Sequence, residues 1–586
     1  MGDFTRGEPI TLTQLFRFFV RILAPEKSFF ALAVIYGVGI SLLSLATPIS
    51  VQMLINTVAN TGLAMPLVVL SLTLFGLLLL SGLLNAMRVH LMEIFGRRFY
   101  ARMVSEITLR SIYAQNPFFT DANHTAIFNR YFDIITVQKN IPVLLIGGFT
   151  LILQAAVGFA LVSFYHPLFL AFNLVVIAFI WAVWFAWGRG AVRAAIDLSH
   201  KKHAAAAWLE ELGSSNGFFK SERHIAHALD KTDAATALYV DQHRKHFHKH
   251  FAQTVSFLVI YAGASAALLG LGGWLVILGQ LSLGQLVAAE LVLSAAFFGV
   301  SQLGTYLNYF YDLCAAIEEL SLFYDITQEE PSGSHLPNRE DASLAFFNVR
   351  GNARGGAATL DFTIDGGAMV MAAASNHGVQ RLLTNLLKRH DAPQSGYIAF
   401  GGVDILETEV NALRQEIIVL DRPTIIETTI RDFLWLSNSG ASPERVLDAI
   451  QHVGLEPVIA ELEDGLDTKL AATGWPLSIT ETMQLKLAAA MLAKPRVLIL
   501  NQLYDLMSPN CLRRAIDFLR SDPSLTVMYF SNRHENLGFE QFLYLGREKQ
   551  TVHKTFEDFR RAAYGRGGAP RAMTPPTARA PHLVKV

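Results

Sequence analysis

The sequence is poor in cysteine and in charged residues. Its 586 residues include only two cysteines, Cys314 and Cys511, which lie far apart, so neither a disulfide framework nor a cysteine zinc motif is supported. Only 17% of the residues are charged, and the net charge of -1 gives no electrostatic reason to expect nucleic acid as a partner. Hydrophobic residues make up 52% of the chain, which is too much for an ordinary soluble protein of two domains. We therefore expect part of the chain to lie among membrane lipids.

Six apolar runs are long enough to cross a bilayer, which takes about 20 residues. The short connections after the first, third and fifth runs contain no lysine or arginine, whereas the long connections after the second and fourth carry several, including Arg97 and Arg193. Positive charge beside a membrane helix favours the cytoplasmic side. We therefore expect the long connections and both termini to be cytoplasmic, and the membrane to be the inner one if the source is bacterial. The runs are Ser28 to Ile49, Pro66 to Met87, Val143 to Ser163, Leu168 to Trp187, Phe257 to Leu278 and Leu281 to Leu303.

The two long connections should extend the membrane helices well beyond the bilayer. Residues 88–140 and 188–250 are rich in Ala, Leu, Glu, Arg and Lys, and their apolar residues recur at helical spacing. Turn-forming and capping residues interrupt each segment near its middle, at 116–125 and 212–220. The sequence therefore predicts two long helical hairpins that hang into the cytoplasm.

The character of the chain changes after residue 327. Residues 328–341 are rich in Pro, Ser and charged residues, which indicates a linker, and residues 342–564 alternate strand-like and helix-like segments, which is typical of an α/β domain. The last residues, 565–586, are rich in Pro, Ala and Arg and are predicted to be disordered. The predicted division is thus a transmembrane domain at 1–327, a linker, an α/β domain and a tail.

The α/β domain contains the outline of a phosphate-binding loop. The segment GAMVMAAASNHGVQRLLTNLL, residues 367–387, predicts a strand, a turn and a helix. A working loop reads G-x-x-x-x-G-K-[ST], in which glycines admit backbone N–H groups to the phosphates, the lysine supplies charge and the hydroxyl helps to hold Mg²⁺. In the register set by the flanking sequence, Gln380 takes the lysine position and Arg381 the hydroxyl position, so the charge-assisted contact is lost. The loop positions are Ala374, Gly378, Val379, Gln380 and Arg381.

Spacing along nearly the whole chain resembles a half-transporter of the ABC exporter family. YIAFGGVDI (397–405) and TIRDFL (429–434) lie where that family has IxIDGxDI and TIRENI, and GLDTKL (465–470), LSITE (477–481) and LAAAMLAKPRVLILNQ (487–502) follow in the family's order. The last membrane run resembles that of type I secretion exporters. The resemblance implies an α-helical transmembrane domain of six helices with long cytoplasmic extensions, followed by an α/β P-loop-type nucleotide-binding domain.

The resemblance also assigns the ATP-handling positions, and the chain departs from the family at nearly every one of them. Asn501 and Gln502 replace the acid that holds Mg²⁺ and the carboxylate that polarises the attacking water. An amide forms hydrogen bonds, but it cannot act as a carboxylate base or neutralise a metal ion. Asp421 stands at the Q-loop glutamine and Asn532 at the switch histidine.

The family signature is altered as well. Within the signature residues, Ile479 and Thr480 replace two glycines whose backbone would approach the γ-phosphate of an ATP held by the opposing subunit. Side chains at these positions obstruct that approach. Because phosphoryl transfer depends on positioning and on charge, the combined changes remove nearly the whole mechanism. The vestigial signature is Ser478, Ile479, Thr480 and Glu481.

Two further features carry possible chemistry. His246 and His250 lie one turn apart on one predicted helix, a spacing that suits Zn²⁺ or Ni²⁺, although Arg244, Lys245 and Lys249 beside them favour a solvated basic helix end. Glu290 lies inside the sixth run, where a charge indicates either a transport pathway or a structural partner on a neighbouring helix.

We therefore predict an ABC exporter-like membrane protein, a catalytically inactive pseudo-ATPase half-transporter that acts in transport as a dimer. Two alternatives remain open: a non-transporting scaffold or regulator, and a divergent but active ATPase exporter. No cofactor is expected, with ATP and Mg²⁺ as the alternative. The expected partners are lipid, a second copy or a different ABC half-transporter, and an additional membrane or secretion protein.

Overall fold

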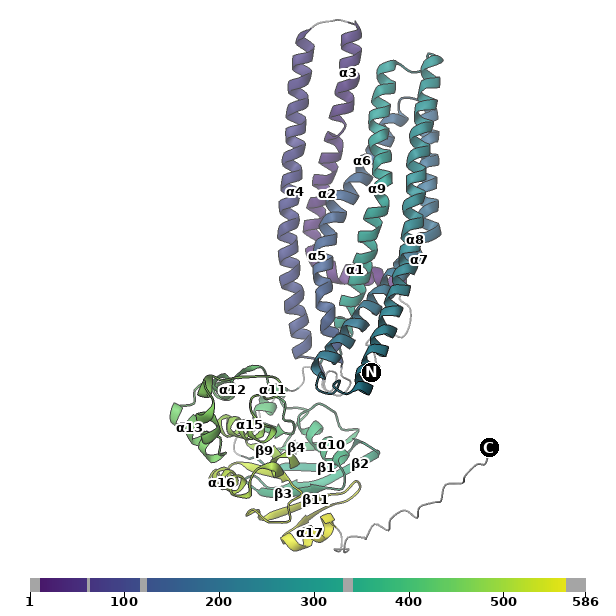
Figure 1. The fold of residues 1–586 in the computed structure, drawn as a ribbon. Helices are drawn as coiled ribbons and strands as arrows, with labels where there is room; N and C mark the ends of the chain where they lie inside the picture. The colour runs from purple at the N-terminus through teal and green to yellow at the C-terminus, as the bar shows by residue number, and fades with distance from the viewer. Residues whose placement is uncertain (1–10, 61–63, 116–123, 330–332, 334–340, 565–586) are drawn as a thin grey trace, which may run out of the picture. The chain divides into compact units, whose positions relative to one another are not determined.

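The computed structural model describes residues 11–60, 64–115, 124–329, 333 and 341–564. Its contacts divide the chain into two compact units, Met1–Glu329 and Glu330–Val586, which we describe separately (Figure 1). Most of the predicted linker, the predicted tail and most of the first predicted interruption at 116–125 lie outside the described residues.

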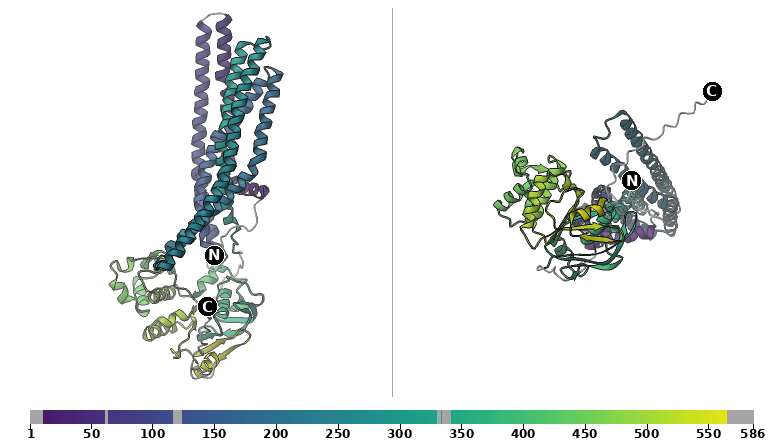
Figure 2. Two further views of the ribbon diagram at one scale, coloured as in Figure 1. Left: turned by 45° about the vertical axis from the view of Figure 1, so that its right-hand side comes forward. Right: turned by 90° about the horizontal axis from the view of Figure 1, so that it is seen from below.

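The first unit is a bundle of long helices, which run side by side in both Figure 1 and Figure 2. Six helical segments of the described chain are long and apolar enough to cross a membrane, which confirms the predicted spans. The helices also extend beyond a bilayer, since α4 has 49 residues and is thus about 70 Å long, against a hydrocarbon core of about 30 Å. The main helices are α4 (Ala64–Ile112), α7 (Pro167–Ser214), α8 (Glu222–Ile277) and α9 (Leu283–Ser321).

Local sequence determines where these helices begin. At the start of α7 the His166 side chain accepts a hydrogen bond from the backbone of Leu168, and Pro167 fills the first helical position. At the start of α9 the Ser282 hydroxyl and the Gln285 side chain form a reciprocal capping box. The predicted interruption at 212–220 corresponds to the turn between α7 and α8.

The first span is less regular than its sequence suggests. It divides into α2 (Lys27–Leu43) and α3 (Ala46–Asn60). Pro48 has no N–H for the carbonyl of Ser44, and the Ser41 and Ser44 hydroxyls donate to backbone carbonyls one turn earlier. These side-chain bonds compete with the regular helical pattern, so the break lies where both effects meet.

The third span contains a wide turn. The π-helical residues Leu144–Gly148 follow Pro142 and separate α5 (Asp133–Val143) from α6 (Phe149–Ser163). An added Cβ at Gly147 would overlap the ring of Tyr306 on α9. The turn therefore lets two helices approach at a position where only glycine fits.

The second unit is an α/β domain. A six-stranded sheet has the order β12-β11-β3-β10-β9-β6, with every neighbouring pair parallel except β11 and β12. Strands β3, β9 and β10 are apolar along their length and almost fully buried, as central parallel strands require. The strands are β3 (Met369–Ala374), β6 (Ile417–Leu420), β9 (Val497–Leu500), β10 (Thr526–Phe530), β11 (Gln541–Leu545) and β12 (Gln550–His553).

A second, antiparallel sheet covers one side of this domain. Its order is β2-β1-β4-β5. Its buried side chains pack with those of α10 (His377–Leu387) and of the large sheet in one core, while α15 (Ile479–Ala493) and α16 (Pro509–Arg520) pack into a second core. The small sheet consists of β1 (Leu344–Ala353), β2 (Gly356–Ile364), β4 (Ser395–Phe400) and β5 (Val403–Asp404).

Candidate functional site

The predicted ATP positions that follow four strands lie at one edge of the large sheet. The loop at Asn376 follows β3, Asn501 and Gln502 follow β9, Asn532 follows β10 and Asp421 follows β6. These four strands are consecutive in the sheet and parallel, so their carboxyl ends meet at the same edge. This edge is the usual ligand-binding position of open α/β sheets.

A side chain within the turn between β3 and α10 caps the start of the helix. The Asn376 carboxamide oxygen accepts a hydrogen bond from the backbone N–H of Val379 at 3.1 Å and caps α10. The N–H groups of a first helical turn are the donors that hold a phosphate in a working loop. One of these donors is therefore already occupied.

Gly378, the glycine that remains in the loop, has a packing role. A Cβ at this position would lie 2.8 Å from the backbone nitrogen of Arg354, in the turn between β1 and β2. Real Cβ atoms almost never approach another atom so closely. Glycine is thus required because backbone packs directly against the start of α10.

The positions of the lysine and the catalytic carboxylate are joined by a hydrogen bond. Gln502 Nε2 donates to Gln380 Oε1 at 2.7 Å, and Gln380 is 3% exposed. The two residues are 122 positions apart in the sequence. Two neutral amides therefore bond to each other at the positions that the sequence predicted for the lysine and the carboxylate.

Asp421 and Asn501 also have their partners within the chain. The Asp421 carboxylate forms a 2.8 Å ion pair with Lys388, and the Asn501 amide donates to the Asp421 carbonyl at 2.8 Å. The Asn501 side-chain oxygen accepts from the backbone of Leu503 at 3.1 Å. Asn501 thus ties the ends of β6 and β9 together.

Sequence reasoning missed the two lysines beside Asp421. Lys388 ends α10, and Lys486, on α15, donates to the carbonyls of Arg422 and Thr424 at 2.6 and 3.1 Å. Burial lowers the pKa of the Lys486 ammonium, while the charge of Asp421 opposes that shift. No local pattern marks either lysine, because each meets its partners through a contact distant in sequence.

Asn532 lies beside another acid that the sequence did not single out. Its backbone N–H donates to Asp505 Oδ2 at 2.9 Å, and the same carboxylate accepts from the hydroxyls of Ser531 and Tyr529. Burial and the nearby charge of Asp505 raise the pKa of Tyr529. Asp505 therefore organises the end of β10 through hydrogen bonds.

The signature segment is also capped internally. The Ser478 hydroxyl accepts from the backbone N–H of Glu481 at 3.3 Å, and the Glu481 carboxylate accepts from the backbone N–H of Ser478 at 2.7 Å. Ile479 is 56% exposed and Thr480 is half-buried. The start of α15 thus presents a carboxylate and a branched apolar side chain, and a carboxylate repels phosphate.

In the helical unit, the predicted histidine pair faces inward. His246 is buried, unlike a residue of the solvated helix end that its basic neighbours favoured, and its ring lies parallel to that of His250 with centroids 6.4 Å apart. His246 Nε2 and His250 Nδ1 are buried atoms without a hydrogen-bond partner. The packing of α8 against Tyr311 of α9 places His246 inside the bundle.

Glu290 lies on α9, and only one of its two carboxylate oxygens has a hydrogen-bond partner. Its Oε1 accepts from the Ser294 hydroxyl at 3.0 Å, one turn further along, while Oε2 is buried without a hydrogen-bond partner. The contact with Ser294 is local to α9. A pathway role and a structural role both remain predictions.

Known proteins of similar sequence are ABC transporters. The chain is 25% identical over 528 residues to the ABC multidrug transporter mdr2 of Aspergillus fumigatus, which covers 85% of this chain and 65% of mdr2. It is 28% identical over 239 residues to the leukotoxin translocation ATP-binding protein LktB of Mannheimia glucosida, which covers 40% of this chain and 34% of LktB. The match thus spans less than two thirds of either relative. No family model matches the chain.

A solved structure has the same architecture. The structure of a bacterial Atm1-family ABC exporter with ATP bound matches with a TM-score of 0.77, over 92% of this chain and 96% of that chain, at 18% identity. At this identity the match shows the fold alone. It confirms the predicted fold class, a six-helix membrane domain followed by an α/β nucleotide-binding domain.

Proposed function

We propose that the chain is a half-transporter of the ABC exporter family and a pseudo-ATPase, since its fold matches an ABC exporter and proteins of similar sequence are ABC transporters. In this proposal it is an integral membrane protein that acts in transport as a dimer and does not hydrolyse ATP at its own site. The basic connections between spans favour a cytoplasmic α/β unit, in the inner membrane if the source is bacterial.

The hydrogen bond between Gln380 and Gln502 is the observation that carries this proposal. At 2.7 Å the Gln502 amide nitrogen and the Gln380 amide oxygen are engaged with each other and not with a ligand. A lysine would attract the phosphates and a carboxylate would polarise water, whereas an amide carries no charge and takes up no proton near neutral pH. The pair therefore replaces catalytic groups with a structural contact.

The remaining groups at this edge do not fit a magnesium–nucleotide complex. Asn376 occupies an N–H at the start of α10, and Lys388 neutralises Asp421 at 2.8 Å. Among the described residues of this edge, the acid that remains near Asn532 is Asp505, which already accepts three hydrogen bonds. Binding of ATP with Mg²⁺ would require several of these contacts to break.

The structure also bears on whether the dimer consists of two copies of this chain or includes a different half-transporter. ABC half-transporters form composite sites in which the signature of one subunit meets the nucleotide of the other. Glu481 caps α15 and would place negative charge against a partner's nucleotide. A heterodimer with a competent half-transporter would then have both sites impaired, so this contact favours a homodimer and leaves a scaffold or regulatory role as the second candidate.

The direct test is ATP hydrolysis by the full chain in lipid nanodiscs. We expect Mg²⁺-dependent turnover no greater than that of empty nanodiscs, and no change in Gln502→Ala. Gln380→Lys alone should not create activity, because Gln502 still cannot polarise water.

The matched control is Gln394→Ala, which removes an exposed glutamine elsewhere in the same unit. Robust turnover that Gln502→Ala abolishes and Gln394→Ala preserves would overturn the proposal in favour of a divergent active ATPase.

Affinity purification from native membranes would distinguish a homodimer from a heterodimer. A stoichiometric second ABC half-transporter would support the heterodimer, and self-association alone would support the homodimer.

A further inference from the structure

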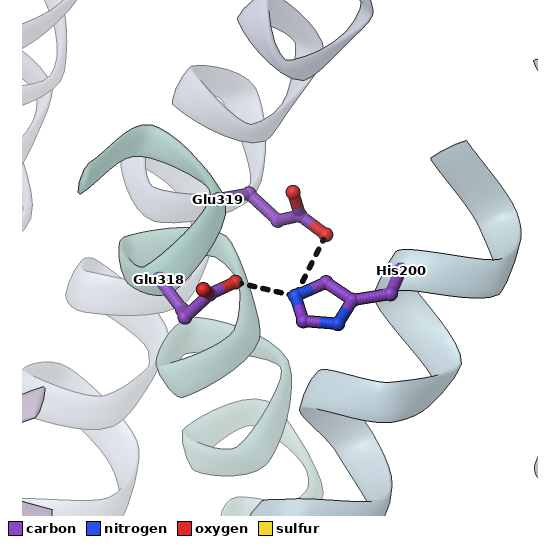
Figure 3. Close-up of side chains that lie close together, drawn as sticks. All are labelled: His200, Glu318 and Glu319. Carbon is purple, nitrogen blue, oxygen red and sulfur yellow. Dashed lines mark hydrogen bonds and ion pairs between the residues drawn. The ribbon is translucent and has the colours of Figure 1, made fainter. Parts of the chain in front are cut away.

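A second group of ionisable side chains lies in the helical unit, outside the degenerate nucleotide site. His200 comes from α7, and Glu318 and Glu319 come from the end of α9; Figure 3 shows the three side chains converging from these two helices. His200 Nε2 lies 2.9 Å from Glu318 Oε2 and 3.9 Å from Glu319 Oε1. One ligand atom from each residue lies within 4.8 Å of the others.

The two carboxylates are buried and incompletely satisfied. Glu318 and Glu319 are both 0% exposed. Oε1 of each carboxylate is a buried atom without a hydrogen-bond partner, and Oε1 of Glu319 faces His200. A buried carboxylate normally has its acceptor positions filled, because an unsatisfied one costs free energy. The free oxygens therefore indicate a missing cationic partner.

The permanent charges around the cluster balance its carboxylates only in part. Arg130 Nε lies 2.6 Å from Glu319 Oε2, and Asp133 binds Lys202 at 3.0 Å and His203 at 2.7 Å. The three acids Asp133, Glu318 and Glu319 face two permanent cations, Arg130 and Lys202, and His200 is the third cation only when it is protonated. A metal ion bound at His200 would take the place of that proton.

We propose that His200, Glu318 and Glu319 form a binding site for a divalent transition-metal ion, Zn²⁺ or Mn²⁺. One imidazole nitrogen and two carboxylate oxygens are a ligand set that such ions accept. Tetrahedral zinc places its ligands about 3.3 Å apart, a spacing that lies between the two measured distances from His200, 2.9 and 3.9 Å. Arg130 binds the outer oxygen of Glu319 and orients it, as outer partners of metal ligands do.

The site has an entrance and a structural consequence. The His200 side chain is 20% exposed, so an ion can reach the cluster from that side. A bound ion would join α7 to α9 near the end of α9. Because the ion binds the folded state, it raises the melting temperature.

The first experiment measures metal content in the full chain. Protein purified in detergent is stripped with a chelator, loaded with Zn²⁺ or Mn²⁺, desalted and analysed by elemental mass spectrometry. We expect about one ion per chain, and a rise in melting temperature on loading. His200→Gln and Glu318→Gln should lose both the ion and the temperature rise.

Two controls locate the ion. His227→Gln removes an exposed histidine of α8 and should retain the metal. The double variant His246→Gln/His250→Gln removes the other histidine pair and should also retain it. Loss of metal in this double variant with retention in His200→Gln would place the ion at the histidine pair and overturn the proposal.

A measurement on the unaltered chain covers the case in which the variants fail to fold. X-ray absorption at the zinc edge of the loaded protein should show one imidazole and two or more oxygen ligands. Two imidazoles, or an unaltered chain that retains no ion after desalting, would overturn the proposal. His200 and Glu318 would then form an ion pair alone.

Discussion

At the carboxyl edge of the large sheet, Gln380 and Gln502 are neutral amides that bond to each other, whereas in the helical unit Glu318, Glu319 and Arg130 are buried together. Burying a charged group costs several kcal/mol unless partners compensate it, about 3–5 kcal/mol when one partner of a buried pair is lost. An amide pair avoids that cost.

In the helical unit, by contrast, some buried side chains are charged. Arg88 on α4 is 2% exposed and donates to the neutral side chains of Thr150 and Asn85 at 2.5 and 2.8 Å. The chain therefore retains costly buried charge in its helices. The absence of charge at Gln380 and Gln502 is a local property of that edge and not a general feature of the protein's interior.

The largest effect should come from breaking the buried ion pair of the helical unit. Arg130→Met removes the partner 2.6 Å from Glu319 and leaves a buried carboxylate uncompensated. We expect a loss of about 3–5 kcal/mol in the free energy of unfolding. Thermal or denaturant unfolding of the purified chain measures it, and the double variant Arg130→Met/Glu319→Leu should recover much of the loss.

The α/β unit provides the control for this prediction. Arg431 and Asp467 form an ion pair at 2.7 Å whose side chains are 57% and 64% exposed. Arg431→Met should leave the unfolding midpoint unchanged, because water solvates the remaining carboxylate. If Arg130→Met has as little effect as Arg431→Met, the contrast between the two regions is wrong.

An intermediate effect is expected at the amide pair. Gln380→Met leaves the part-buried Gln502 without its 2.7 Å partner, and because water reaches Gln502 in part we expect a cost at the lower end of the range for an unsatisfied polar group, about 1–2 kcal/mol. Removing both amides, in Gln380→Met/Gln502→Leu, should be nearly neutral, since apolar groups of similar shape can replace a buried polar pair. A double-mutant cycle on unfolding free energies measures the coupling. Additive losses would show that the hydrogen bond contributes no stability.

The smallest effect is expected at the cap of α10. Asn376→Ala removes the side chain that accepts from Val379 and should cost about 1 kcal/mol of unfolding free energy. It should not confer binding of a fluorescent ATP analogue, because the charged groups remain absent. Ser478→Ala, which removes the cap of α15, is the matched control and should destabilise the chain by a similar amount. Nucleotide binding gained by Asn376→Ala would show that the cap alone closes the loop.

Much of the fold could be predicted because its signals are local. An apolar run such as Pro66 to Met87 reports a membrane helix by length and composition, and alternating strand and helix patterns report the α/β domain. The division of the first span beyond Leu43 was not predicted, because it depends on how Ser41, Ser44 and Pro48 combine inside a uniformly apolar stretch.

The candidate site was predictable in position and only partly in its contacts. Spacing located Asp421, Asn501 and Asn532, which the structure brings to one edge. The bonds that occupy these groups, such as the one from Lys388 to Asp421, join different elements and leave no pattern in either segment. The assignment of roles to these positions remains a prediction that the proposed assays test.

The sequence by itself determined which positions lack charge, since an amide at Gln380 or Gln502 is uncharged in any fold. It also determined that the chain enters a membrane, because apolar length and composition suffice for that inference. Only the tertiary structure decided that these two amides bond to each other and that His200 meets Glu318, 118 residues away. Such contacts depend on how separate helices and strands pack together, and packing between distant segments is not encoded in the local pattern of either one.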